Sequence, residues 1–472
     1  MNHTSNPGAL FHFPASANAC LVDEAGTPFS YLVIREHVQR LAAELAKLPQ
    51  PALLFLYASN SVESVVSYLA CLQARVPLCL CEPQVSSFER LVAAYQPSGL
   101  FVPSDCEGAG QFRERCKILD RLRLLSCPSG RPFEHEIHSD LALLLTTSGS
   151  TGSPKLVRLS SDNLASNAES IARYLELNPE EKPIQSLPMQ YSYGLSVLNS
   201  HLHAGATVVL TRHSFLRPEF WTQFREAECT SFAGVPYAYE TLHRLGWDPG
   251  EQPTLRSFTQ AGGALKRDLI SHYCQKAADA DQRFFVMYGQ TEATARISFV
   301  PPERLAEKIG SIGVAIPGGA LSLESIPSNP EVQQLVYEGR NVMLGYAEGP
   351  QDLGRGDDLH GVLRTGDLAE RDADGYYFVK GRLSRFAKLF GKRVSLGDLE
   401  ELVERRFGHH AVALDRGSKL EILVESPCPE LRSIQTFLAE TLALPPSALQ
   451  IGNIESIPMT ASGKIDYRAV GA

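Results

Sequence analysis

The sequence predicts an α/β protein with a large N-terminal domain of parallel-rich sheets and packed helices, a small β subdomain, and a small, mobile α+β domain at the C-terminus. In the first half, short apolar runs alternate with segments of helical periodicity, a pattern typical of parallel sheets covered by helices. After about residue 310, glycine and proline become frequent. The length of 472 residues exceeds what one ordinary core accommodates, so we expect at least two domains.

The alternation begins near the N-terminus. Tyr31–Leu48 carries apolar residues at helical spacing, and Ala52–Tyr57 is a continuous apolar run typical of a strand buried on both faces. Asn60–Ala74 returns to the helical period, and Val76–Leu80 predicts the next strand. Further strands of this kind are predicted at Ile184–Leu187, Thr207–Leu210, Ser231–Ala233 and Phe284–Met287.

The second half predicts short strands separated by turns, followed by a compact tail. The expected strands are Val336–Tyr337, Gly375–Val379, Phe386–Leu389, Ala411–Leu414 and Leu420–Val424, and the expected helices are Leu399–Phe407 and Ile434–Leu442. A boundary near Arg382–Arg385 gives an N-terminal domain of residues 1–383 and a C-terminal domain of residues 384–472.

Composition excludes several classes of function. Hydrophobic residues make up 44% and charged residues 21%, which is ordinary for a soluble globular protein. The net charge of -9 provides no global basic field for nucleic acid or an anionic membrane. No apolar run approaches the roughly 20 residues of a membrane span, and the N-terminus lacks signal-peptide character. The 10 cysteines lack metal-ligand spacing, and we expect Cys79 and Cys81 to be buried thiols of a cytoplasmic protein.

Residues Leu143–Lys155 read LLLTTSGSTGSPK, an apolar strand that leads into a loop of Ser, Thr and Gly. Such a loop can direct backbone N–H groups and hydroxyls at a polyphosphate, with Lys155 adding a positive charge. Taken alone, the same composition fits a polar surface loop. The P-loop of nucleotidases is excluded because Pro154 separates the glycines from Lys155 and a second apolar run follows instead of a helix.

The stretch Thr147-Ser-Gly-Ser-Thr-Gly-Ser-Pro-Lys155 resembles the signature loop of the adenylate-forming superfamily, which comprises acyl-CoA synthetases, carrier-protein adenylation domains and beetle luciferases. Every defined position of that loop is matched. The resemblance implies that the nucleotide is bound by Thr147, Ser148, Gly149, Ser150, Thr151, Gly152 and Lys155.

A second segment, Tyr288-Gly-Gln-Thr-Glu-Ala293, resembles the Y-G-x-T-E motif of this superfamily. The resemblance implies that Tyr288 packs near adenine, that Thr291 bonds the α-phosphate, and that Glu292 helps to hold Mg²⁺, since a hard cation prefers carboxylate oxygen. Thr291 and Glu292 are therefore expected catalytic residues, with Glu292 as the metal ligand. The nucleotide-binding residues implied around them are Gly262, Gly263, Ala264, Tyr288, Gly289 and Gln290.

The C-terminal half continues the resemblance. Arg364-Thr-Gly-Asp-Leu368 resembles the ribose-binding segment, with Asp367 accepting hydrogen bonds from the ribose hydroxyls, and Arg382 would contact the nucleotide. The hinge position is Ser384, where the superfamily usually has Asp or Lys. Pro458-Met-Thr-Ala-Ser-Gly-Lys464 resembles the C-terminal motif whose lysine acts during adenylation, which makes Lys464 an expected catalytic residue. Gly339-Arg-Asn-Val-Met-Leu-Gly-Tyr346 matches a further segment of the superfamily.

The resemblance implies ATP-dependent activation of a carboxylic acid to an acyl-adenylate, with release of pyrophosphate, followed by acyl transfer to a thiol. ATP and Mg²⁺ are expected, with CoA or the phosphopantetheine of an acyl or peptidyl carrier protein as the acceptor. No nucleic acid partner is expected. Two alternatives stay open: an adenylate-forming enzyme whose second step uses no thiol, and an inactive relative that binds acyl groups.

The acid pocket is expected at Tyr191, Tyr193, Gly194, Val235 and Tyr239. Superfamily members that activate amino acids carry an Asp that pairs with the substrate ammonium at the position of Gly194. A buried ammonium without a partner is costly, so we expect an acid that lacks an α-amino group. Members that activate acyl or aryl acids often carry His where Tyr191 stands, so the class of acid stays open. The tyrosines fit either a pocket lining or a plain core.

Overall fold

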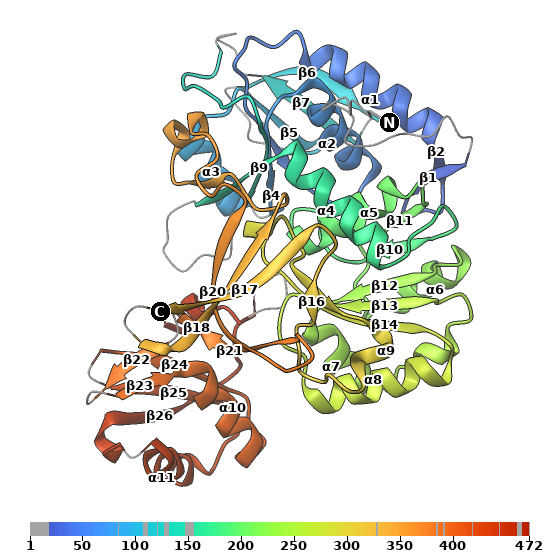
Figure 1. Cartoon of the computed structure of the whole chain (residues 1–472). Coiled ribbons are helices and arrows are strands. Elements are labelled where there is room, and N and C mark those ends of the chain that lie inside the picture. Colours follow the sequence, from blue (N-terminus) through green and yellow to red (C-terminus); the bar gives the residue numbers. More distant parts are fainter. Residues whose placement is uncertain are drawn as a thin grey trace. The chain divides into compact units, whose positions relative to one another are not determined.

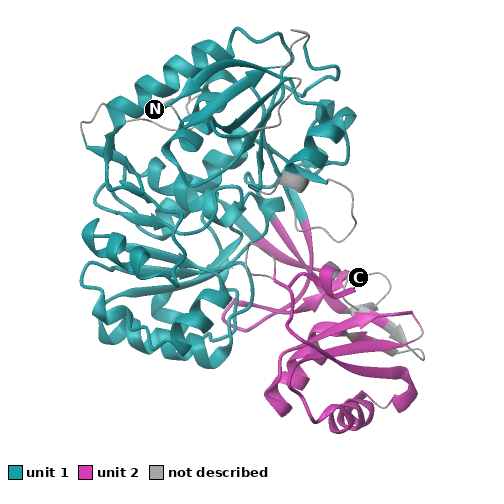
Figure 2. Ribbon diagram, turned by 180° about the vertical axis from the view of Figure 1, so that it is seen from behind, with its two compact units in different colours: residues 1–320, 338–363 teal, residues 321–337, 364–472 magenta. Residues whose placement is uncertain are grey.

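The computed structural model of the protein describes residues 18–83, 85–106, 112–119, 121–126, 132–146, 155–326, 329–383, 386–389, 392–417, 419–442, 444–459 and 465–471. The chain divides into two compact units (Figure 2). Unit 1 comprises residues 1–320 and 338–363, and unit 2 comprises residues 321–337 and 364–472. The domain boundary expected between residues 383 and 384 falls inside unit 2 and stays a prediction.

One sheet of unit 1 has the strand order β19-β9-β8-β4-β3-β5-β7-β6. Strands β8, β4, β3 and β5 run parallel, whereas the outer strands pair antiparallel. Alternate residues of β3 enter different cores, because Leu54 and Leu56 pack with one cluster and Phe55 packs with another. The strands are β3 (Leu54–Tyr57), β4 (Leu78–Cys81), β5 (Gly99–Pro103), β6 (Arg113–Ile118), β7 (Leu122–Ser126), β8 (Leu141–Thr146), β9 (Leu156–Ser160) and β19 (Gly345–Ala347).

The other large sheet of unit 1 has the order β16-β15-β14-β13-β12-β10-β11-β1-β2 (Figure 1). Its central strands from β14 to β1 are parallel, and the edge strands β15, β16 and β2 are antiparallel. The strands are β1 (Ala19–Val22), β2 (Pro28–Ser30), β10 (Pro183–Gln185), β11 (Val208–Leu210), β12 (Ser231–Gly234), β13 (Ser257–Gln260), β14 (Arg283–Tyr288), β15 (Ser298–Val300) and β16 (Val314–Ala315).

Helices cover both sheets, as the apolar strand pattern predicts. Helix α5 serves both of them: Leu195 and Leu198 belong to the core that contains Leu54, while Val197 and His201 line a small cavity beside β12 and β13. The helices of unit 1 are α1 (Tyr31–Leu45), α2 (Val62–Ala74), α3 (Val85–Tyr95), α4 (Ser161–Tyr174), α5 (Ser192–His203), α6 (Pro218–Glu226), α7 (Pro236–Arg244), α8 (Arg267–Asp279) and α9 (Pro302–Leu305).

Unit 2 contains most of a sheet ordered β17-β18-β20-β21, a hairpin of β22 and β23, and a sheet ordered β24-β25-β26. A core that includes Leu399, Ile422 and Leu438 joins this last sheet to its helices. The elements are β17 (Gly319–Ile326), β18 (Asn329–Gly339), β20 (Val362–Arg371), β21 (Tyr377–Arg382), β22 (Phe386–Leu389), β23 (Lys392–Ser395), α10 (Leu396–Phe407), β24 (Ala411–Asp415), β25 (Leu420–Glu425), α11 (Leu431–Leu442), β26 (Leu449–Ile454) and α12 (Tyr467–Gly471).

The predicted fold class is confirmed, and the elements named in the sequence analysis are present with shifted ends. The helix expected from Asn60 begins at Val62 because the Ser61 side chain accepts a hydrogen bond from the backbone N–H of Ser64 and caps it. Cys79 and Cys81 are buried, as predicted. Among the described residues, no helix combines the length and apolar character that a membrane span requires.

Candidate active site

Part of the predicted site lies outside the described residues. This applies to Thr147, Ser148, Gly149, Ser150, Thr151 and Gly152, to the hinge position Ser384, and to Lys464. The strands on either side of the predicted phosphate loop are described, and they pair antiparallel, with Thr146 opposite Leu156. As predicted, a second strand and not a helix follows Lys155.

The Tyr288–Ala293 motif begins where β14 ends. A Cβ at Gly289 would lie 1.8 Å from the carbonyl oxygen of Ala295, so the tight turn at this position requires glycine. A short 3-10 helix, Thr291–Ala293, follows. The Thr291 hydroxyl lies 3.2 Å from that of Ser192, which places the motif beside the start of helix α5.

Glu292 has one contact with strand β19 and one with the residues just before it. Its carboxylate accepts a hydrogen bond from the Tyr346 hydroxyl (Oε1 to Oη, 2.7 Å), and its backbone carbonyl accepts one from the N–H of Met343 (2.9 Å). Lys155 lies over the ring of the same tyrosine, with Nζ 3.5 Å from the centroid of the Tyr346 ring and 4.0 Å from the carboxylate of Glu348. The fold therefore brings Lys155 and Glu292, from separate predicted motifs, to one aromatic side chain.

The Lys155 ammonium and the Thr291 hydroxyl are donors that fit a polyphosphate, and the Glu292 carboxylate fits a hard divalent cation. Within the part of the chain that the structure describes, the buried Nε2 amide of Gln290 has no hydrogen-bond partner. A buried donor left unpaired is costly, and a phosphate oxygen would satisfy it. The residues present here therefore suit ATP and Mg²⁺.

Gly262, Gly263 and Ala264 follow strand β13. Gly262 has a φ of +91°, and a Cβ there would lie 2.5 Å from the Tyr191 hydroxyl and 3.3 Å from a methyl group of Val235. The structure thus places Gly262 against two residues expected in the acid pocket. The carbonyl of Gly263 accepts a hydrogen bond from the Gln260 side chain (2.8 Å).

Two of the tyrosines expected in the acid pocket are core side chains. Tyr193 and Tyr239 are 2% and 0% exposed, and both hydroxyls donate to the carbonyl of Thr259 at 2.9 Å. Burial raises the pKa of both phenols. At Gly194, on the same helix as Tyr193, a Cβ would lie 2.2 Å from the carbonyl oxygen of Pro188.

A buried arginine that the sequence analysis did not single out packs against Tyr193, one of the residues expected in the acid pocket. Arg296 is 2% exposed, and its guanidinium lies 3.9 Å from the centroid of the Tyr193 ring. Its Nε has no hydrogen-bond partner among the described residues. Periodicity does not reveal such a residue, since an isolated Arg in a sequence is most often exposed.

Unit 2 holds the remaining described residues of the predicted site. Asp367 on β20 and Arg382 on β21 are opposite each other in the antiparallel register, and Arg382 Nε donates to Asp367 Oδ1 at 2.9 Å. The Asp367 side chain is buried, whereas that of Arg382 is 57% exposed. The Thr365 hydroxyl accepts a hydrogen bond from the backbone N–H of Asp367 (3.1 Å). The structure therefore brings together Asp367, the predicted ribose-binding residue, and Arg382, which is predicted to contact the nucleotide.

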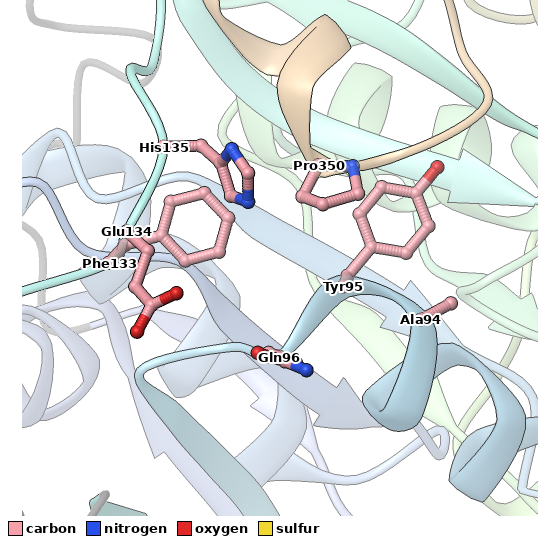
Figure 3. Close-up of a pocket in the computed structure, with 7 residues that line it drawn as sticks. All are labelled: Ala94, Tyr95, Gln96, Phe133, Glu134, His135 and Pro350. Atoms are coloured by element: carbon pink, nitrogen blue, oxygen red, sulfur yellow. The ribbon is translucent and has the colours of Figure 1, made fainter.

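A cavity of about 120 Å³ lies elsewhere in unit 1, at the end of helix α3 (Figure 3). In Figure 3 the rings of Phe133 and His135 lie on one side of it, and those of Tyr95 and Pro350 lie on the other. None of the described residues predicted for the site lines this cavity.

Comparison with known proteins agrees with the motifs. The sequence profile of the family "AMP-binding enzyme" matches residues 13–347. Sulfoacetate–CoA ligase from Cupriavidus necator is 30% identical over 351 residues, which cover 70% of this chain and 67% of that protein. Oxalate–CoA ligase from Arabidopsis thaliana is 28% identical over 355 residues, which cover 70% of this chain and 67% of that protein.

The fold is also that of a solved structure. The o-succinylbenzoate–CoA synthetase of Bacillus subtilis, in complex with its acyl-adenylate intermediate, superposes with a TM-score of 0.79 at 20% identity and covers 97% of this chain and 96% of its own. This chain therefore belongs to the family of AMP-binding enzymes, and it is a ligase that activates a carboxylic acid with ATP as an acyl-adenylate and then transfers the acyl group to a thiol.

Proposed function

We propose that the acid activated by this enzyme has no α-amino group. The observation that carries this proposal is the packing of Gly194, where a Cβ would lie 2.2 Å from the carbonyl oxygen of Pro188 and 2.7 Å from that of Leu187. An aspartate at position 194 would require the backbone of residues 187–188 to move. Position 194 therefore provides no carboxylate to pair with a substrate ammonium, and the carbonyl groups of Leu187 and Pro188 occupy the space that such a side chain would need.

The charge of the surroundings supports the same proposal. Arg296 lies against the ring of Tyr193, which is one residue before Gly194. The ring centroids of Tyr193 and Tyr191 are 6.3 Å apart. A buried guanidinium repels an ammonium group through a medium of low dielectric constant. The two CoA ligases compared above act on sulfoacetate and oxalate, which are acids without an amino group.

The nucleotide roles follow the family motifs. We assign the phosphates to Lys155, Thr291 and the Thr147–Gly152 loop, and the ribose to Asp367 with Arg382. Glu292 would hold Mg²⁺, which would neutralise phosphate charge that otherwise repels an attacking carboxylate. Gln290 would donate its buried amide to a phosphate oxygen.

The second step needs a thiol on a phosphopantetheine arm, which CoA and a carrier protein share. We propose that residues 384–472 form a mobile domain, that Ser384 is its hinge, and that Lys464 contributes its charge during adenylation only. A hinge residue needs only to absorb backbone torsion, so serine can serve where Asp or Lys is usual.

ATP–pyrophosphate exchange across a panel of short, long, aryl, hydroxy, dicarboxylic and amino acids tests the proposal. We expect exchange with one class of acid other than amino acids, and we expect Glu292→Gln to lower it at least tenfold. Exchange stimulated by amino acids alone would overturn the assignment based on Gly194. No exchange with any acid, despite ATP binding, would favour an inactive acyl-binding relative.

The acceptor is tested with the acid that this panel identifies. Free CoA and a phosphopantetheinylated carrier protein are supplied in separate reactions, and AMP release and thioester formation are measured. We expect thioester with one of the two. AMP release that needs neither thiol would favour an adenylate-forming enzyme with a different second step.

A further inference from the structure

Tyr346 lies between two charged groups that come from different motifs. Its ring lies under the Lys155 ammonium, with Nζ 3.5 Å from the ring centroid, and its hydroxyl donates to Glu292 Oε1 at 2.7 Å. The aromatic face attracts a cation, whereas the hydroxyl binds a carboxylate. The Tyr346 side chain thus contacts both Lys155, which follows the predicted phosphate loop, and Glu292, the expected metal ligand.

The backbone fixes the position of this tyrosine. Strand β19 pairs antiparallel with β9, which puts Tyr346 opposite Val157. Arg158 Nε donates to the carbonyl of Tyr346 at 3.2 Å, and Arg158 Nη2 lies 2.6 Å from the Asp358 carboxylate. Gly345 has a φ of +140°, and a Cβ there would lie 2.3 Å from that carboxylate, so only glycine fits between Tyr346 and the ion pair.

We propose that Tyr346 is a positioning residue for the nucleotide and its metal ion, an inference that rests on the roles proposed above for Lys155 and Glu292. The hydroxyl restrains the Glu292 carboxylate in one orientation, so less entropy is lost when a cation binds. The ring restrains the Lys155 ammonium. The Glu348 carboxylate, 4.0 Å from Nζ, is the competing partner toward which Lys155 turns when the ring is removed.

Two substitutions separate these effects. Tyr346→Phe keeps the ring under Lys155 and removes the hydroxyl from Glu292, whereas Tyr346→Leu removes both. The measurements are calorimetric titration of ATP with and without Mg²⁺, in the absence of acid, and ATP–pyrophosphate exchange as a function of Mg²⁺ concentration.

For Tyr346→Phe we expect unchanged affinity for ATP without Mg²⁺ and an increase of about tenfold in the Mg²⁺ concentration that gives half-maximal effect, the scale of one hydrogen bond to a charged group. For Tyr346→Leu we expect, in addition, a loss of about threefold in ATP affinity without Mg²⁺, the scale of an exposed cation–π contact.

The matched control is Tyr95→Phe. The Tyr95 hydroxyl donates to the carbonyl of Ala347 at 3.0 Å, so this variant also loses a tyrosine hydroxyl bonded to strand β19, but one that does not bond to Glu292. If Tyr95→Phe shifts the Mg²⁺ dependence as much as Tyr346→Phe does, or if neither shifts it, the positioning role is overturned. Wild-type protein that binds ATP but catalyses no exchange would contradict the proposed function alone, because the titrations still decide the role of Tyr346.

Discussion

His201 is a residue whose chemistry depends on burial. It lies on the face of helix α5 that lines a cavity of about 20 Å³ together with Arg296. Its Nδ1 lies 2.8 Å from the carbonyl of Val197, and burial lowers its pKa from 6.5 to about 4. The ring is therefore neutral at pH 7. In this neutral form Nδ1 carries the proton and donates it to the carbonyl of Val197, and Nε2 is unprotonated. Protonation would place a second positive charge beside the arginine.

Because the pKa of His201 is lower in the folded than in the unfolded protein, its contribution to stability is present above pH 6.5 and is lost as the pH falls toward 4. Between pH 7 and pH 5 the loss is about 2 kcal/mol in the free energy of unfolding. Urea unfolding at both pH values should show this loss in the wild type and not in His201→Gln. The control is His203→Gln, on the exposed side of the same helix, which should keep the wild-type pH dependence. Equal pH dependence in all three proteins would contradict the assignment.

At the scale of elements, the strand that carries Tyr346 is attached to the sheet through Arg158. This arginine is fully buried, lies 2.6 Å from the Asp358 carboxylate, and donates to the carbonyls of Tyr346 (3.2 Å) and Gly356 (3.2 Å). One guanidinium thereby joins the carbonyl of Tyr346 in β19 to that of Gly356, ten residues further along the chain. The ion pair between Arg158 and Asp358 ties residue 358 to strand β9, and its arginine is buried. A fully exposed ion pair would contribute little to the free energy of unfolding.

We expect Arg158→Met to lower the free energy of unfolding by about 3 kcal/mol, because it leaves the carbonyls of Tyr346 and Gly356 without their buried donor and removes the buried partner of the Asp358 carboxylate, which keeps its contact with the more exposed Arg355 (3.0 Å). Hydrogen exchange at the amides of β19 should accelerate, while that of β3 and β4 should change less. The control is Arg340→Met, which removes an ion pair with Asp162 whose side chains are 67% and 55% exposed, and whose loss should cost less than about 1 kcal/mol. Similar losses in the two variants would show that the buried pair has no special role.

At the scale of the whole molecule, what the sequence predicted follows from local patterns. Buried strands such as Leu54–Tyr57 are recognisable in the sequence as continuous apolar runs. The motif around Thr291 and Glu292 is recognisable because its residues are contiguous in the chain. Contacts between distant segments could not be predicted in this way. The bond from Tyr346 to Glu292 depends on the pairing of β19 with β9, and no periodicity in the sequence encodes that pairing. The Nε of Arg296, which has no hydrogen-bond partner in the part of the chain that the structure describes, is likewise a property of the packed core.

The two chemical steps of the enzyme are expected to need different parts of the chain, and the half-reactions can be measured separately. Lys464→Ala should lower ATP–pyrophosphate exchange by about 100-fold, because it removes a charge that stabilises the transition state for adenylation. Thioester formation from preformed acyl-adenylate should stay near the wild-type rate.

Ser384→Pro should have the reverse effect, because proline fixes φ at the expected hinge and restricts the rearrangement between the two steps. Exchange should be retained while transfer to the thiol slows, and Ser384→Ala, which leaves the backbone free to rotate, should resemble the wild type in both. Opposite losses in the lysine and proline variants would establish that residues 384–472 serve the two steps in different arrangements. A parallel loss of both half-reactions in each variant would mean instead that these positions maintain the fold, and the assignment of Ser384 as the hinge would fail.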